Sequence, residues 1–498
     1  MRILLTALAG LALAAPAWTQ PAWAQKDTLT VDLASDVATM DPHVQWDPES
    51  SSVYRNIFDN LVTRDIPGKI VPQVATAWRY TDPLTLVFDL RTDILFQDGS
   101  KLTPEDVAFS VRRMINPAFK SPQLSQFDQI VSADVTGPAQ VTLRTKTPYP
   151  VLLAQLTKLS IVPKAYVEKL GDVAFNQQVM GSGPFRLRSW QRGQQSVIDA
   201  VDGYWGPKPT FKTAIFRAVP DATTRMADLR TSRADIIRGV SPDDAITLKT
   251  EPGIKLLTVP SERVAYLFMN AQFGPTKDKR LRQAISMAVD RDLIISALQQ
   301  GFGKKVDIVL PASNFGYMAD IPFWPYDPAR ARALVKEIGA EGTSVVFLTA
   351  PSYDRRLNEA VQQMLAEVGL KVDIVSVDFP TYLRRRQGQP EESGHLAQGR
   401  WSCGCQDADG VIFPLFRSGS IWSKFSNPEF DAAVDAARIV LDENERMKYY
   451  RRAFEILREE IPAIPLFQDV SIFAARKELQ WTPTPNEAFF LTDMKWQN

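Results

Sequence analysis

The chain has 498 residues and no net formal charge, because 57 lysines and arginines balance 57 aspartates and glutamates. This balance provides no general electrostatic attraction to nucleic acid or to an anionic membrane surface. Hydrophobic residues make up 45% of the sequence, which excludes extensive disorder, and the length exceeds what one hydrophobic core can organise, so we expect two or three compact lobes.

The N-terminal segment has the pattern of a secretory signal peptide. Arg2 precedes an apolar run over residues 3–15, and Ala22-Trp23-Ala24 gives a small-x-small cleavage pattern. The run is too short to span a bilayer, and no later stretch is long and apolar enough to do so. We therefore expect cleavage near Ala24, which leaves residues 1–24 outside the fold, and an exported periplasmic protein that is not embedded in the membrane.

The segment from residue 27 to about residue 130 is predicted to be mainly strand with one clear helix. Apolar residues alternate with other residues ahead of the Asp98-Gly99 turn, which is typical of a half-buried strand. The alternating residues are Leu84, Leu86, Phe88 and Leu90. A helix is predicted to begin at Pro104, because Thr103 is a good N-cap and Asp106 completes a capping box. Its apolar face consists of Val107, Val111 and Met114.

The second half of the sequence is richer in helix. One helix is predicted over residues 276–301, which carry an apolar stripe, and another over 327–339, which begin with an Asp327 cap; both segments end at a glycine. Residues 343–377 have the pattern of strand, helix and strand, which predicts a βαβ unit and a parallel sheet. A helical block over residues 427–462 leads back to a strand. The mixed order favours α/β lobes that share segments of chain.

The known signatures of enzymes are absent from the sequence. It contains no HExxH, no GxSxG and no Walker-type phosphate loop, and spacing marks no two carboxylates as a catalytic pair. The two histidines, His43 and His395, lie far apart in sequence, and a lone histidine more often packs or lies on the surface than binds a metal. We therefore expect a protein that binds a molecule without changing it, with no catalytic residues, metal site or cofactor.

Four segments, spread along most of the chain, together form a recognisable pattern. The segments are residues 71–114, 181–194 with 202–209, 265–294 and 323–339. Together they resemble the solute-binding proteins of peptide and nickel ABC importers, the dipeptide- and oligopeptide-binding group of family 5. The resemblance covers nearly the whole mature chain. It implies an α/β periplasmic binding protein fold of the cluster C type, with mixed sheets, in which two lobes close over a ligand.

The resemblance also implies three domains and a hinge. The domains would be I, residues 25–56, 181–262 and 473–498; II, an insertion of residues 57–180; and III, residues 263–472. Chain crossovers near Val264 and Val470 would form the hinge, since positions at element ends can absorb a rotation of the lobes without a flexible linker.

A transport function follows from the same resemblance. The protein would capture a small polar solute, a peptide or peptide-like molecule, and deliver it as a monomer to an inner-membrane ABC permease complex. A non-peptide ligand in the same role stays open: an oligosaccharide, an amino-acid conjugate or opine-like compound, or a metal chelate. Two other classes also stay open, namely a periplasmic chaperone or sensor-partner module and a secreted hydrolase.

One expected ligand contact is missing from the sequence. In peptide-binding members, the loop after a buried tryptophan carries an aspartate that pairs with the α-amine of the ligand. Trp401 matches this tryptophan, and Gly404 stands where the aspartate would be. A buried ammonium without a counter-charge is costly, so this departure argues against a free-amine peptide in the usual pose. Asp407 or Asp409 could substitute from a shifted loop.

The only two cysteines, Cys403 and Cys405, flank Gly404 and would belong to the same wall of the ligand cleft. Three interpretations stay open: a local disulfide that shapes the loop, two small buried thiols, or a metal or redox site. An oxidising periplasm favours the disulfide.

Further substrate-binding residues are implied by their positions in the family pattern. Trp46 and Asp47 would lie at the edge of a lobe, and Arg386 would contact a ligand carboxylate with its planar guanidinium. Tyr353 and Gln398 would line the cleft elsewhere. Simpler alternatives are that Trp46 is a packing aromatic and that the run of arginines around Arg386 is a solvated helix face.

Overall fold

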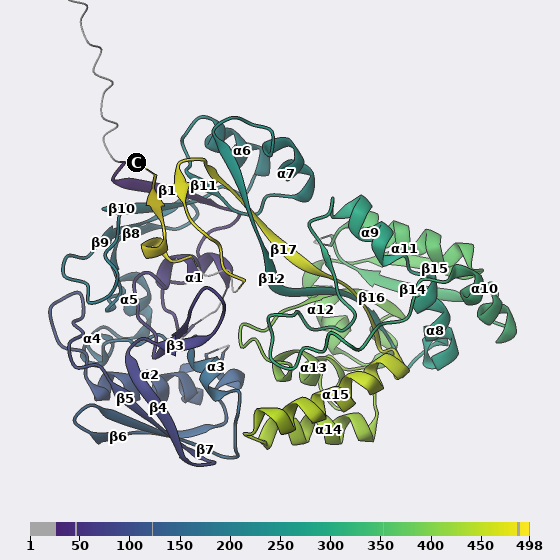
Figure 1. Ribbon diagram of the computed structural model, residues 1–498, viewed down its shortest axis with the longest axis horizontal. Coiled ribbons are helices and arrows are strands. Elements are labelled where there is room, and N and C mark those ends of the chain that lie inside the picture. The colour runs from purple at the N-terminus through teal and green to yellow at the C-terminus, as the bar shows by residue number, and fades with distance from the viewer. Residues whose placement is uncertain (1–25, 45–46, 122, 352, 486–488, 498) are drawn as a thin grey trace, which may run out of the picture.

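The computed structural model describes residues 26–44, 47–121, 123–351, 353–485 and 489–497, which form two lobes (Figure 1). The predicted signal peptide and Trp46 lie outside the described residues. The long antiparallel strands β12 (Ile254–Met269) and β17 (Ala463–Arg476) run from one lobe into the other. They lie in the middle of an eleven-stranded sheet that mixes parallel and antiparallel pairs, so the two-lobed α/β fold is as predicted.

The first lobe holds one end of this large sheet, in the order β17-β11-β1-β10-β9-β8. Strand β1 lies between β10 and β11 and pairs with both in parallel. The strands are β1 (Thr28–Leu33), β8 (Phe185–Gln191), β9 (Gln195–Ala200), β10 (Thr213–Ala218) and β11 (Ile236–Ile237). The helices are α1 (Pro48–Tyr54), α6 (Ala222–Arg230) and α7 (Pro242–Leu248), and near the C-terminus β18 (Leu479–Gln480) and β19 (Lys495–Trp496) form a two-stranded antiparallel sheet.

A separate four-stranded antiparallel sheet, in the order β4-β5-β7-β6, lies in the same lobe. Its strands are β4 (Ala75–Asp82), β5 (Thr85–Leu90), β6 (Ile130–Gly137) and β7 (Gln140–Thr145), and a small hairpin joins β2 (Val62–Arg64) to β3 (Ile70–Pro72). The helices are α2 (Pro104–Ile115), α3 (Leu152–Leu156), α4 (Lys164–Leu170) and α5 (Asp172–Gln177).

Helix α2 confirms the predicted capping box. The Thr103 backbone N–H donates to Asp106 Oδ2 over 2.9 Å, and the three predicted apolar residues of the helix are buried. The predicted strand is also present as β5, but its first alternating residue was placed wrongly. Leu84 precedes the strand in a turn, where its N–H donates to Asp82 Oδ1, and its side chain is exposed.

The second lobe holds the other end of the large sheet, in the order β15-β14-β16-β12. Its strands are β13 (Lys304–Lys305), β14 (Ser344–Thr349), β15 (Lys371–Ser376) and β16 (Leu396–Trp401). Its helices are α8 (Lys279–Ala288), α9 (Arg291–Leu298), α10 (Pro328–Glu337), α11 (Arg355–Glu367), α12 (Phe379–Gln387), α13 (Asp409–Phe416), α14 (Pro428–Ile439) and α15 (Glu443–Glu460). Short 3-10 helices in the chain are Pro117–Phe119, Leu124–Gln126, Pro275–Lys277, Pro390–Glu392 and Leu491–Asp493.

Two predictions for this lobe are confirmed and one is wrong. The βαβ unit is present as β14, α11 and β15, with the two strands parallel, and Asp327 caps α10 by accepting from the Arg330 N–H. The single helix predicted over 276–301 is two helices, α8 and α9. The chain leaves the helical conformation at Val289, and Asp290 then caps α9 by accepting from the Leu293 N–H.

The crossing strands show an irregularity where the resemblance implied a hinge. The pairing of β12 with β17 shifts register between Pro260 and Val264, next to the partner residue Val470. The hinge and the domain limits themselves stay predictions. No helix in the described part of the chain is both long and apolar enough to cross a membrane.

Candidate ligand-binding site

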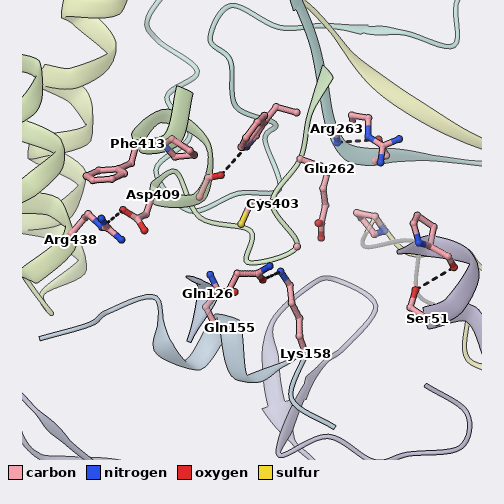
Figure 2. A pocket seen from close by; sticks show the side chains of 18 of the residues that line it. Ser51, Gln126, Gln155, Lys158, Glu262, Arg263, Cys403, Asp409, Phe413 and Arg438 are labelled. Carbon is pink, nitrogen blue, oxygen red and sulfur yellow. Dashed lines mark hydrogen bonds and ion pairs between the residues drawn. The ribbon is translucent and has the colours of Figure 1, made fainter. Parts of the chain in front are cut away.

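A cavity of about 550 Å³ lies between the two lobes (Figure 2). One side is built by the first lobe, through α1 and the segments around α3, and the other by β12, the loop after β16, and α13. The residues that line it are Pro48, Ser51, Gln126, Tyr149, Gln155, Lys158, Ser261, Glu262, Arg263, Trp401, Ser402, Cys403, Gly404, Asp409, Gly410, Phe413, Pro414, Arg438 and Pro485.

Trp401 forms a fixed aromatic wall of the cavity. It ends strand β16, where its backbone pairs with Val264 of the crossing strand β12. Its indole N–H donates to the Gly410 carbonyl over 2.9 Å, and its ring packs edge-on against Trp422 at 5.5 Å between centroids. Because these contacts hold the ring in place, it needs little reorganisation to stack on a ligand.

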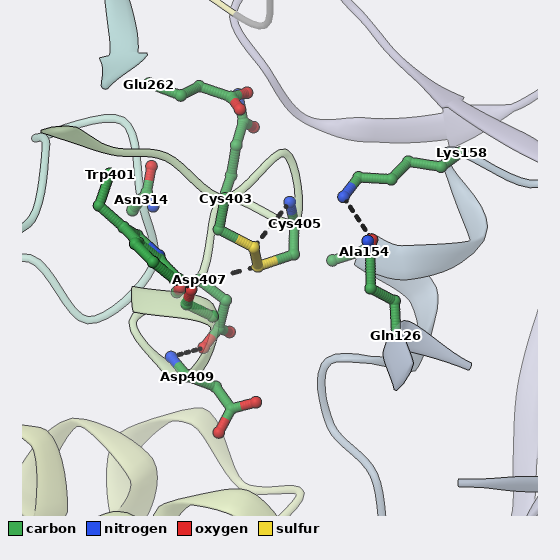
Figure 3. Close-up of a disulfide and its surroundings, with 12 residues drawn as sticks. Gln126, Ala154, Lys158, Glu262, Asn314, Trp401, Cys403, Cys405, Asp407 and Asp409 are labelled. Carbon is green, nitrogen blue, oxygen red and sulfur yellow. Dashed lines mark hydrogen bonds between the residues drawn. A yellow bond between two sulfur atoms is a disulfide. The ribbon is translucent and has the colours of Figure 1, made fainter. Parts of the chain in front are cut away.

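The loop after Trp401 carries a disulfide between Cys403 and Cys405 (Figure 3). Of the three interpretations, the structure therefore has the local disulfide. Cys403 lines the cavity, whereas Cys405 is fully buried and packs with the core of the four-stranded sheet across the gap between lobes. A Cβ at Gly410 would lie only 2.2 Å from Cys403 Sγ, so a glycine is required there for the disulfide to fit.

The same loop also joins the lobes through hydrogen bonds. The guanidinium of Arg64, on β2, donates to the Cys405 carbonyl over 2.8 Å. From the same loop, Gln406 Nε2 donates to Glu262 Oε1 on the crossing strand β12 over 2.6 Å. The structure is thus a closed arrangement, in which this loop of the second lobe contacts the first.

Lys158 occupies the space beside Gly404. A Cβ added at position 404 would lie 2.8 Å from Lys158 Cε and 3.2 Å from its Nζ, so a larger residue would require the lysine to move. The ammonium of this buried lysine donates to Gln126 Oε1 over 2.8 Å (Figure 3). The Lys158 ammonium therefore borders the position where the resemblance implies a carboxylate, and Glu262 Oε2, 3.7 Å from the same added Cβ, borders it as well.

Both nearby aspartates already have positively charged partners. Asp407 lies outside the cavity lining and accepts hydrogen bonds from Arg446 and Tyr450. Asp409 does line the cavity, but it forms an ion pair with Arg438 over 2.9 Å. Burial raises the pKa of Asp409 to about 6, against the opposing effect of Arg438.

Comparison with known proteins agrees with this architecture. Residues 69–423 match the family described as bacterial extracellular solute-binding proteins, family 5 Middle. The chain belongs to this family of solute-binding proteins. It is 28% identical to the dipeptide-binding protein of Escherichia coli over 449 residues, which cover 83% of each chain. It is 29% identical to the glutathione-binding protein GsiB of Salmonella typhimurium over 490 residues, 95% of this chain and 94% of that one.

A solved structure is also similar to this solute-binding protein over most of its length. The binding protein AgaA from A. tumefaciens R10, in complex with agropinic acid, is 25% identical, with a TM-score of 0.77. The match covers 95% of this chain and 99% of that one.

Three residues predicted to bind ligand lie elsewhere in the second lobe. Arg386 is buried over the ring of Phe268, 3.5 Å from its centroid, and Gln398 is buried on β16. Tyr353 is half-buried and packs against Tyr382. None of the three lines the cavity described above, so their contact with a ligand stays a prediction.

Of the other residues predicted to bind ligand, some line the cavity and some do not. Trp401, Cys403 and Gly404 line the cavity, and Cys405 lies behind it. Asp47 caps helix α1 by accepting from the Ser50 N–H, next to the lining residue Pro48, and its contact with a ligand also stays a prediction.

Both histidines have structural partners. Arg113 donates to Nδ1 of the buried His43, whose Nε2 is 2.8 Å from the Ser160 carbonyl, and burial lowers the pKa of this histidine to about 4. His395 Nδ1 accepts from the Val346 N–H. Within the described residues, no three His, Cys, Asp or Glu side chains form a group that could hold a metal ion.

Sequence analysis named Asp409 but missed other charged residues of the cavity, among them Lys158, Glu262 and Arg263. Lys158 comes from the segment after α3, whereas Glu262 and Arg263 come from the crossing strand β12. One signal was available: Lys158 stands in the mainly apolar segment of residues 151–163, where burial is expected and a buried lysine is rare unless it is paired.

Proposed function

We propose that this protein is the periplasmic binding component of an ABC importer, and that it captures a small, peptide-like solute in the cavity beside Trp401. The observation that carries the proposal is a cavity of about 550 Å³ with walls from both lobes. This volume is within the range of about 300–1,000 Å³ that is typical of small-molecule sites.

Capture and delivery follow from this geometry. A ligand that contacts both lobes stabilises the closed arrangement over the open one, and the equilibrium can shift only by the difference in its affinity for the two. The closed form, with the signal peptide removed near Ala24 and the protein monomeric, would then be recognised by an inner-membrane permease. Relatives named for binding dipeptides and glutathione support a peptide-like ligand.

Two observations distinguish this function from its rivals. The enclosed volume suits a small molecule and does not suit an unfolded polypeptide, which disfavours a chaperone. Two acids near the cavity, Asp409 and Asp407, are engaged by arginines, and a third, Glu262, accepts from the Gln406 amide, which disfavours a hydrolase that needs a free carboxylate.

The test is native mass spectrometry of the protein after export to the periplasm, followed by a thermal-shift screen. We expect one small molecule bound per monomer, and a raised melting temperature with members of a panel of peptides, amino-acid conjugates, sugars and metal chelates. Turnover of a chromogenic peptide or glycoside, or binding of unfolded protein with no small molecule bound, would contradict the proposal.

A further inference from the structure

The carboxylates around the cavity are already engaged. Asp409 pairs with Arg438, and Asp407 with Arg446. The buried Glu262 accepts from the amide of Gln406. The two aspartates are therefore paired with guanidinium groups, and Glu262 interacts electrostatically with the ammonium of Lys158, so a ligand ammonium would compete with a cation of the protein at each of the three.

The guanidinium of Arg263, in contrast to these carboxylates, is not engaged by another described residue. Arg263 is half-buried and lines the cavity from the crossing strand β12 (Figure 2). Its backbone N–H donates to Ser261 Oγ, but its guanidinium has no hydrogen bond or ion pair with any residue that the structure describes. It also lines a second cavity of about 240 Å³ next to the crossing strands, so it stands where the two cavities adjoin.

A second guanidinium behind the cavity adds to this positive charge. Arg64 donates to two backbone carbonyls, those of Gly68 and Cys405, and no carboxylate within the described ranges forms an ion pair with it. Its Nε is buried without a hydrogen-bond partner there. Lys158, whose ammonium donates to Gln126, adds a further positive charge on this side of the cavity.

From these contacts we infer that the natural ligand is a small organic anion, whose carboxylate or phosphate group binds the guanidinium of Arg263 while its body lies against Trp401. A guanidinium presents parallel N–H donors that match both of these oxyanions. Trp401 and Phe413 offer aromatic surface for the remainder of the molecule. The inference rests on the proposed function and narrows the class of ligand.

The pH dependence of binding should reveal the contribution of Lys158. Burial lowers the pKa of Lys158 to about 8; Glu262 opposes this shift, and Arg64 and Arg55 add to it. A bound anion favours the charged ammonium, so affinity should be constant below pH 8 and fall by up to about tenfold per pH unit above it. Titration calorimetry from pH 6.5 to 9.5 measures this.

The matched variant for this measurement is Lys158→Met, which removes the titrating group. Its affinity at pH 7 should be lower than that of the wild type and should no longer fall above pH 8. An unchanged pH profile in the variant would show that Lys158 does not act on the bound ligand.

The decisive experiment compares ligands that differ only in charge. The panel pairs N-acetyl amino acids, N-acetyl dipeptides and sugar acids with their primary amides, and sugar phosphates with the unphosphorylated sugars. We expect binding of acids or phosphates, with the uncharged partners about 10- to 100-fold weaker, as for loss of a charged hydrogen bond. The two arms of the panel distinguish a carboxylate from a phosphate.

Variants at position 263 assign the effect to this arginine. Arg263→Gln should remove the preference for the acid over its amide, and Arg263→Lys should retain part of it. The control is Arg355→Gln, which loses the same charge from a side chain that is 88% exposed on α11 and should bind as the wild type does.

The possible outcomes separate the two proposals. Preferential binding of neutral or cationic panel members, or an acid preference that survives Arg263→Gln, would overturn the inference and leave the transport function intact. Binding of no panel member, together with no small molecule in native mass spectrometry, would remove the proposed function as well.

Discussion

Trp401→Ala is expected to weaken ligand binding by at least about 30-fold, with the protein still folded. The tryptophan forms an aromatic wall of the cavity, and truncation of a well-packed aromatic contact of this kind costs about 2 kcal/mol or more. The ring is half-buried and lies at the end of β16, so the surrounding core does not depend on it alone.

Two further variants make this measurement specific. Trp401→Phe keeps an aromatic wall but loses the N–H that donates to Gly410, and should have an intermediate affinity. Trp324→Ala is the control, because Trp324 lies away from the cavity, where its indole N–H donates to the Arg458 carbonyl. Titration calorimetry with the ligand found by native mass spectrometry gives the three affinities. An unchanged affinity in Trp401→Ala would place the ligand outside this cavity.

Secondary structure was predicted correctly where it depends only on residues that are neighbours in sequence. The capping box of Thr103 and Asp106 and the Asp327 cap depend on neighbouring residues only, and both helices begin where predicted. The error at residues 276–301 has a local cause too. Asp290 caps a new helix within the apolar stripe, and the prediction from apolar periodicity alone did not take this capping residue into account.

Sequence analysis predicted cavity residues only where they lie together in one short motif. Trp401 and the cysteine loop form one short segment with a family pattern, and these residues do line the cavity or lie behind it. Lys158 and Arg263 approach this loop from segments more than one hundred residues away in sequence, and no local spacing connects them. The chain crossovers that bring them together are long-range contacts, which a single sequence does not specify.

Asp407→Asn is expected to lower the free energy of unfolding by about 3–5 kcal/mol, the usual cost of breaking a buried ion pair by removing one partner. The side chains of Asp407 and Arg446 are only 6% and 4% exposed, and Arg446 Nη2 lies 2.9 and 3.0 Å from the two carboxylate oxygens. Asparagine keeps the shape but not the charge, so the guanidinium would remain buried without its counter-ion.

The exposed pair of Arg452 and Glu429 provides the control for this substitution. Its side chains are 46% and 60% exposed, so Glu429→Gln should change stability by less than about 1 kcal/mol. Urea unfolding followed by tryptophan fluorescence compares both variants with the wild type. Asp407 also connects the end of the cysteine loop to α15, since Tyr450 donates to it as well. A shift no larger than that of the control would show that this buried pair contributes little to the stability of the fold.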